Sequence, residues 1–134
     1  MATWDNGAVD NAAVDTVIAQ TVDILRREGA RFAYLYGSRT ADPTQDSDID
    51  LTAYFVHDAP QGFDVLLPPR VDLLVLDRVP LELAGRVAAR GRLLFGDDPV
   101  SRVRWESMTR KMYFDEMPRM TRAHREFAAS VLGG

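Results

Sequence analysis

The chain has no cysteine among its 134 residues, so it can form neither a disulfide nor a thiolate zinc site. This absence is compatible with a reducing compartment. No stretch approaches the roughly 20 consecutive apolar residues that a membrane-spanning helix needs. Residues 1–15 carry acids and no basic residue, unlike the start of a signal peptide. We therefore expect a cytoplasmic protein with no membrane segment.

Positive charge is scarce and unevenly placed. The net charge is −4, and residues 101–134 hold seven basic and four acidic side chains, which leaves −7 for the first hundred residues. Such an acidic body argues against direct nucleic-acid binding, which needs a basic face to meet phosphates. The basic end is typical of a solvated helix face, and the alternative is a surface that binds an acidic partner.

The length allows a single domain, residues 1–134, and a composition of 46% hydrophobic and 27% charged residues is that of a globular protein. Apolar periodicity predicts a helix over 11–27, closed by Gly29 in a left-handed cap. It also predicts strands over 31–36, 49–56 and 70–76, the last apolar enough to be central. A helix over 80–89, a short edge strand over 92–95 and a helical segment over about 100–132, interrupted at Pro118, should follow. This order indicates an α/β or α+β domain, with a small mixed sheet flanked by helices.

Two aspartates alternate with apolar residues at the start of the second strand. Asp48 and Asp50, at i and i+2, should project from one face with Cβ atoms roughly 6–7 Å apart. Magnesium prefers carboxylates together with substrate phosphates, so the pair suits a nucleoside triphosphate site. The alternative is a pair of surface acids, but like charges on one sheet face repel each other unless a cation offsets them.

A Gly-Ser step precedes this strand. Gly37 lets backbone N–H groups approach a phosphate closely, and Ser38 adds a hydroxyl donor. Nine residues separate Ser38 from Ser47, enough for the chain to leave one strand and enter its neighbour. The combination predicts a phosphate-binding turn beside the carboxylates.

Asp72 is the candidate third carboxylate, because an acid within an apolar strand is expensive to bury without charged partners. In two-metal chemistry such a group completes one ion's site and helps to draw off the acceptor proton. The alternative is a buried salt bridge with Arg70 or Arg31. Asp77 should cap the turn that follows it, and Asp64 should lie in a loop.

Gly37-Ser38, the spacer, Ser47-Asp48-Ile49-Asp50-Leu51 and the later Asp72 together resemble the DNA polymerase β-like nucleotidyltransferase superfamily. Within it, the match is to the minimal nucleotidyltransferase (MNT) domains, over about residues 12–95. The resemblance implies that fold, ATP as donor and magnesium as cofactor, with two ions held by Asp48, Asp50 and Asp72 as the catalytic triad. It also implies that Gly37, Ser38, Arg39 and Ser47 bind the nucleotide. A basic residue common in the family after the Gly-Ser step is missing here, and Arg39 is the candidate to replace it.

Many MNT proteins are antitoxins paired with a HEPN ribonuclease toxin, and they transfer AMP to a tyrosine of that toxin. The resemblance therefore implies a protein adenylyltransferase (AMPylation) in a toxin-antitoxin system. Two alternatives stay open: a nucleotidyltransferase acting on a small molecule such as an aminoglycoside, and an antitoxin that neutralises its partner by binding alone.

Methionine and aromatic side chains recur along the C-terminal helical segment, and flexible Met-rich faces adapt to partners. We take them as a candidate partner surface; its residues are Trp105, Met108, Met112, Phe114, Met117 and Met120. Arg119 and His124 fit the Arg-x4-His pattern of HEPN ribonucleases, but no room remains for a HEPN bundle, so the match is read as coincidence. His57 should lie exposed in a loop.

Overall fold

The computed structural model describes residues 2–36 and 48–132, with side chains from residue 13 onward. Its helices are α1 (Ala2–Arg27), α3 (Leu81–Arg90) and α4 (Pro99–Leu132). The strands are β1 (Phe32–Tyr36), β2 (Ile49–Tyr54), β3 (Val71–Val75) and β4 (Arg92–Gly96), and two 3-10 turns are η1 (Gly62–Asp64) and η2 (Leu76–Arg78). None of these helices is long and apolar enough to cross a membrane.

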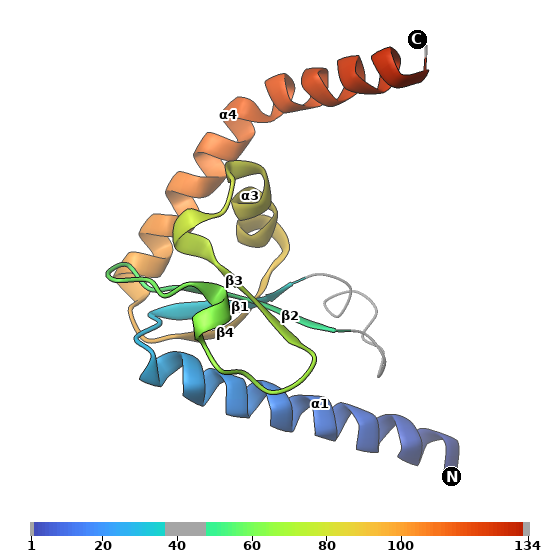
Figure 1. Ribbon diagram of the computed structural model, residues 1–134, viewed down its shortest axis with the longest axis vertical. Coiled ribbons are helices and arrows are strands. Elements are labelled where there is room, and N and C mark those ends of the chain that lie inside the picture. The colour runs from blue at the N-terminus through green and yellow to red at the C-terminus, as the bar shows by residue number, and fades with distance from the viewer. Residues whose placement is uncertain (1, 37–47, 133–134) are drawn as a thin grey trace.

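The strands form one mixed sheet in the order β3-β2-β1-β4 (Figure 1). β1 pairs antiparallel with both β2 and β4, whereas β2 and β3 are parallel. The prediction that β3 is central is wrong, because it lies at one edge. Its apolar residues are nevertheless partly covered, since η1 packs against this strand.

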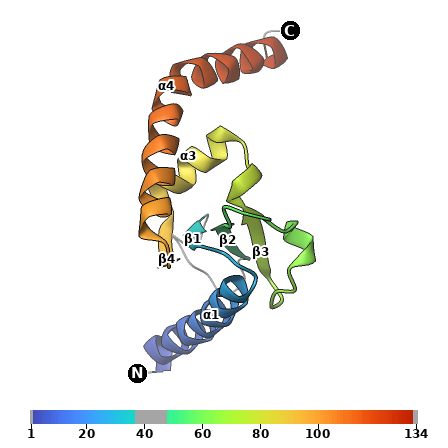
Figure 2. The same cartoon turned by 90° about the vertical axis from the view of Figure 1, so that its left-hand side faces the viewer.

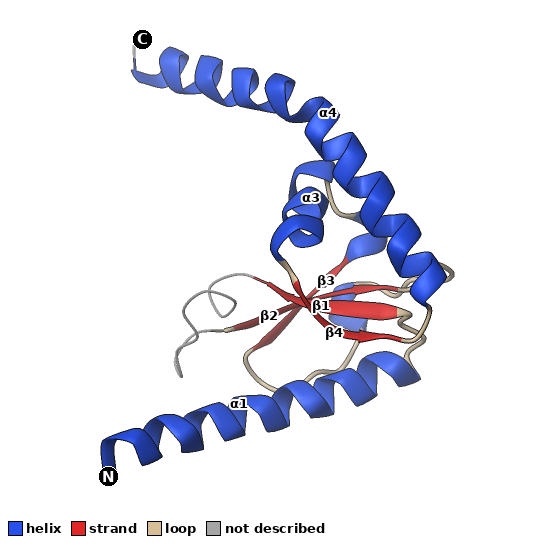
Figure 3. Ribbon diagram, turned by 180° about the vertical axis from the view of Figure 1, so that it is seen from behind, coloured by secondary structure: helices blue, strands red, loops and turns tan. Residues whose placement is uncertain are grey.

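Helices cover both faces of the sheet (Figure 3). α1 lies along one face, where Val14, Val17 and Ile18 pack against Leu35, Ile49 and Leu51. This helix begins at Ala2 rather than at residue 11, because the apolar periodicity marks only the part that packs on the sheet. Gly29 then ends it with φ of +98°, the expected left-handed cap.

α3 and α4 cover the opposite face through an aromatic cluster. The rings of Phe32 and Tyr54 stack with centroids 5.0 Å apart, and Trp105 of α4 lies 5.7 Å from both Phe32 and Tyr34. Aromatic contacts of this kind add to the free energy of simple burial. Trp105 is therefore a packing residue that fixes α4 on the sheet.

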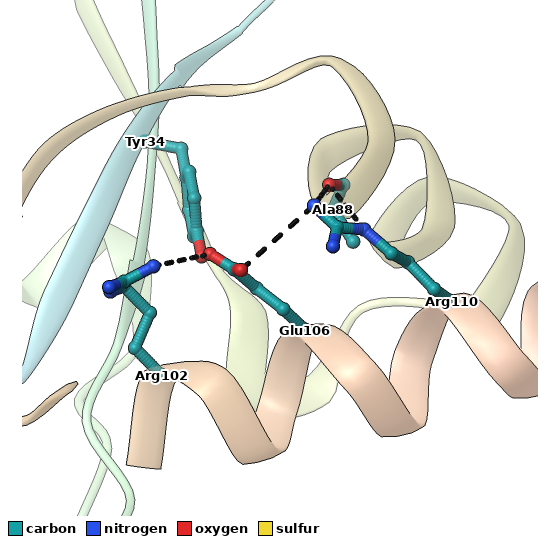
Figure 4. Close-up of polar contacts among 5 residues, drawn as sticks. All are labelled: Tyr34, Ala88, Arg102, Glu106 and Arg110. Carbon is teal, nitrogen blue, oxygen red and sulfur yellow. Dashed lines mark hydrogen bonds and ion pairs between the residues drawn. The ribbon is translucent and has the colours of Figure 1, made fainter. Parts of the chain in front are cut away.

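Polar contacts add to this attachment (Figure 4). The buried Tyr34 hydroxyl donates a hydrogen bond of 2.5 Å to Glu106, and Arg102 donates to the same carboxylate at 3.1 Å. Arg110 donates to the Ala88 carbonyl at 2.8 and 3.2 Å, so it joins α4 to the end of α3. Gly85 allows α3 and α4 to approach closely, because a Cβ there would clash with the Tyr113 ring.

α4 is a single helix that contains Pro118 rather than being interrupted there. Figure 2 shows that the helix changes direction along its length. A proline inside a helix removes one hydrogen bond and bends the axis without ending the helix. Residues 121–132 are all exposed, so the last part of α4 extends away from the body (Figures 1 and 2).

Candidate active site

Two of the three predicted carboxylates lie side by side on the sheet. The pairing register places Asp50 of β2 opposite Asp72 of β3 on one side and opposite Tyr36 of β1 on the other. Adjacent strands lie about 4.8 Å apart, and residues paired across them project from the same face. We call this row, Tyr36, Asp50 and Asp72, the carboxylate row.

The carboxylate row lies on the face that α3 and α4 cover. Tyr36 packs against the cluster that contains Phe32, Tyr34, Leu76 and Val87. On the other face, Ile49, Leu51 and Ala53 are buried, so the predicted alternation along β2 is confirmed. The strand ends at Tyr54 rather than at residue 56.

Tyr36 was not predicted as a site residue. Burial raises the pKa of its phenol, and the negative charges of Asp50 and Asp72 raise that pKa further. Both carboxylates therefore act on this side chain, which stays neutral and able to donate a hydrogen bond at neutral pH. A sequence signal was present, since Tyr36 directly precedes Gly37.

The three acids differ in exposure. Asp50 is half-buried, whereas Asp48, just before β2, and Asp72 are exposed. The expectation that Asp72 is a buried acid is wrong, because β3 is an edge strand; the alternative of a buried salt bridge fails for the same reason. Asp72 is therefore a candidate metal ligand because it lies beside Asp50, and not because it is buried.

The described ranges, 2–36 and 48–132, contain no group of three or more His, Cys, Asp or Glu side chains arranged to hold a metal ion. Asp50 and Asp72 alone offer a two-carboxylate donor set. Magnesium often takes only one or two protein carboxylates and completes its shell with water and substrate phosphates. The donor chemistry therefore fits magnesium with a nucleotide. Gly37, Ser38, Arg39 and Ser47 lie outside the described residues.

Asp77 has a different role from the one expected. Instead of capping the turn that follows, its carboxylate accepts hydrogen bonds of 2.9 Å from the backbone N–H groups of Phe55 and Val56. Val56 has φ of +73°, which is rare for a β-branched residue, so these bonds hold an unusual turn at the end of β2. Asp64 lies in η1, within the connection from β2 to β3.

The candidate partner surface lies away from the carboxylate row. Trp105 packs in the aromatic cluster, while Met108, Met112 and Phe114 are exposed. A cavity of about 440 Å³ between α3 and α4 is lined by Tyr54, Trp105, Met108 and Met112 among others. Tyr54 is four residues from Asp50 along β2, roughly 13 Å by strand rise.

The two histidines show only surface contacts. His57 is exposed, as expected. His124 lies 3.5 Å from Glu82 of α3, and Arg119 lies 3.3 Å from Glu116 within α4. These contacts are consistent with reading the Arg-x4-His spacing as coincidence.

Comparison with known proteins identifies the fold through solved structures. No protein-family profile matches the chain, and no curated protein matches it. The chain is similar to a chain of a toxin-antitoxin complex with AMP-PNP, at 20% identity and a TM-score of 0.64, over 87% of this chain and 98% of that one. A mutant of the MntA-HpeT toxin-antitoxin matches at 17% identity and a TM-score of 0.62, over the same shares. A tri-AMPylated HEPN toxin of Shewanella oneidensis in complex with MNT antitoxin contains a chain that matches at 20% identity and 0.58, over 82% of this chain and 98% of that one.

Proposed function

We propose that this chain is a magnesium-dependent nucleotidyltransferase of the MNT type, which transfers AMP from ATP to a tyrosine of a HEPN-type toxin and so acts as its antitoxin. The solved structures to which it is similar establish the fold. The activity is inferred from the site, and we place it in the cytoplasm.

The proposal is based mainly on the arrangement of the carboxylate row. Asp50 and Asp72 are neighbours on parallel strands, and β1 ends at Tyr36, directly before the Gly37-Ser38 step. The two acids and the end of β1 thus lie at the same end of the sheet, and the Gly37-Ser38 step follows β1 in the sequence. Two adjacent carboxylates are an electrostatic cost to the fold unless they serve a cation.

The proposed chemistry is a single displacement at phosphorus. The acceptor tyrosine oxygen attacks the α-phosphorus of ATP, the bond from that phosphorus to the oxygen bridging the β-phosphate breaks, and pyrophosphate leaves. The phenolic proton passes to a carboxylate of the row; Asp72 is our choice because it is exposed and can meet an incoming protein. Gly37, Ser38, Arg39 and Ser47 are proposed to hold the triphosphate.

Asp48, Asp50 and Asp72 would hold magnesium. When bound, magnesium would neutralise the charge of the triphosphate and stabilise the charge that develops on the transferred phosphoryl group. Asp50 and Asp72 are held on the strands of the sheet, and Asp48 directly precedes β2. Tyr36 borders that set on the β1 side.

What the similar structures contain supports this proposal. One holds AMP-PNP, an ATP analogue, and another holds a HEPN toxin that carries AMP groups. A third is a mutant in which two aspartates, two positions apart, are replaced by glutamate. Asp48 and Asp50 have the same spacing here.

The experiment is intact-mass spectrometry of a HEPN protein encoded by a neighbouring gene, after incubation with this chain, ATP and magnesium. We expect a mass gain in whole AMP units with the wild type, and no gain with Asp48→Asn, Asp50→Asn or Asp72→Asn. Asp23→Asn is the matched control, because Asp23 is an exposed acid of α1 that belongs neither to the row nor to the connection between β2 and β3. Its activity should equal that of the wild type.

The two other functions predict different results. If the HEPN protein gains no mass but forms a tight complex that survives all three substitutions, the chain is an antitoxin that acts by binding. If it neither gains mass nor binds, while aminoglycosides are modified, the acceptor is a small molecule.

A further inference from the structure

Two large apolar side chains in the connection between β2 and β3 are almost completely exposed to solvent. Phe63 is 86% exposed and Leu66 is 90% exposed. Burying a side chain of this size stabilises a protein substantially, so its exposure on an ordered segment is a common sign of a binding surface.

This connection is held in place rather than loosely attached. Arg78 donates hydrogen bonds to the carbonyls of Ala59 and Pro60, at 2.7 and 2.8 Å. Val65, which lies between the two displayed side chains, is buried at 6% exposure. The hydrogen bonds from Arg78 hold the backbone before Phe63, and the buried Val65 holds it between Phe63 and Leu66. Both exposed side chains therefore have defined positions. Little conformational entropy would be lost when a partner covers them.

The displayed side chains lie beside the carboxylate row. A cavity of about 410 Å³ along β3 is lined by Phe63, Leu66 and Asp72, together with Gly62, Val65, Leu67, Val71 and Leu73. Asp72, the carboxylate proposed to accept the acceptor's proton, is therefore a wall of the same cavity. Whatever occupies this cavity lies next to the site of transfer.

Charge indicates the chemistry of the occupant. Acids outnumber bases among the exposed charged side chains here: Asp58 and Asp64 in the connection, Asp72 in the row and Asp48 just before β2, against Arg70 and Arg78. A partner segment that fits would bring an apolar patch flanked by basic side chains.

We propose that the surface formed by Phe63 and Leu66 beside Asp72 is the docking site for the acceptor protein, and that it delivers the acceptor tyrosine to the carboxylate row. This inference rests on the proposed function and names where its substrate binds. The occupant is a folded protein whose apolar patch, flanked by basic residues, lies next to the modified tyrosine. The apolar pair supplies the contact, and the acidic surroundings set its orientation.

The test is the double variant Phe63→Ser/Leu66→Ser in the full chain, with the HEPN protein as acceptor. Both side chains are exposed, so the variant should unfold at the wild-type temperature and bind AMP-PNP with magnesium as tightly as the wild type. We expect the KM for the HEPN protein, or the Kd of the complex, to rise at least tenfold, as hot-spot truncations do, with kcat within twofold of wild type. The matched control is Phe127→Ser/Val131→Ser, at the end of α4, where the side chains are 71% and 61% exposed.

Each outcome bears on the inference. A rise in KM or Kd for the Phe63/Leu66 variant with an unchanged tail variant supports it. Weakening by the tail variant alone, equal weakening by both, or no change in either overturns it. So does a wild type that dimerises through Phe63 and Leu66 in light scattering. If the wild type binds the HEPN protein but transfers no AMP, the proposed function fails, while the Kd still tests the docking surface.

Discussion

Replacing Tyr34 by phenylalanine should destabilise the fold by weakening the attachment of α4 to the sheet. Tyr34 is 3% exposed, and its hydroxyl donates a hydrogen bond of 2.5 Å to the Glu106 side chain, itself only 15% exposed. A hydrogen bond to a charged group contributes about 1.5–3 kcal/mol. Glu106 keeps its contact with Arg102 at 3.1 Å, so we expect a loss near the lower end, about 2 kcal/mol. For a chain of this size, the Tm should fall by roughly 8 °C.

Urea unfolding followed by circular dichroism measures this loss. The cycle formed by Tyr34→Phe, Glu106→Gln and the double variant should give a coupling free energy of at least about 1 kcal/mol. A Tyr34→Phe protein that unfolds within about 0.5 kcal/mol of wild type would refute the reasoning, because that is the range of substitutions without a structural role. An unchanged m value would show that the unfolded state is the same in each variant.

Three further predictions concern the stability of the fold. Gly85→Ala adds a Cβ that clashes with the Tyr113 ring, so it should lower the free energy of unfolding by about 1–3 kcal/mol in urea titration. Asp77→Ala removes the acceptor for two backbone N–H groups at the end of β2 and should cost about 2 kcal/mol by the same assay. Burial, and then Glu106, raise the pKa of Tyr34 above its ordinary value. The stability that the protonated Tyr34 hydroxyl contributes is therefore complete below about pH 10 and is lost as the pH rises through the folded-state pKa of Tyr34. In alkali, the free energy of unfolding should therefore fall less steeply for Tyr34→Phe than for the wild type.

Local patterns predicted much of the fold. The alternation of Ile49, Leu51 and Ala53 identified the apolar face of β2, because side chains on a strand alternate with a period of two. Gly29 marked the end of α1, because glycine adopts the left-handed backbone of a helix cap without steric cost. These features depend on residues close together in sequence.

Features that depend on distant residues were missed. The edge position of β3 follows from its partner strand and from η1, and neither is visible in the run Val71–Val75. Asp77 reaches back to residues near the end of β2, whereas a local reading assigns it to the next turn. Tyr36 joined the candidate site only when the antiparallel register placed it opposite Asp50.

The candidate site remains a prediction, and the structure gives only the placement of some of its residues. The sequence identified Asp50 and Asp72 as candidates, and the register places them side by side. The reason given for Asp72, the expense of burying an acid, was wrong because its strand is at the edge. Phe63 and Leu66 could not be identified from the sequence, because an apolar residue in a loop can face either the core or the solvent.

We propose that the carboxylate row transfers AMP, and labelled ATP distinguishes this from transfer of a terminal phosphate. The HEPN protein is incubated with this chain and magnesium, in parallel with ATP labelled at the α-phosphate and ATP labelled at the γ-phosphate. We predict that the α-label alone becomes covalently attached, and that Asp50→Asn, with an unchanged Tm, abolishes the transfer. Attachment of the γ-label, or of the α-label at the wild-type rate by Asp50→Asn, would contradict the account.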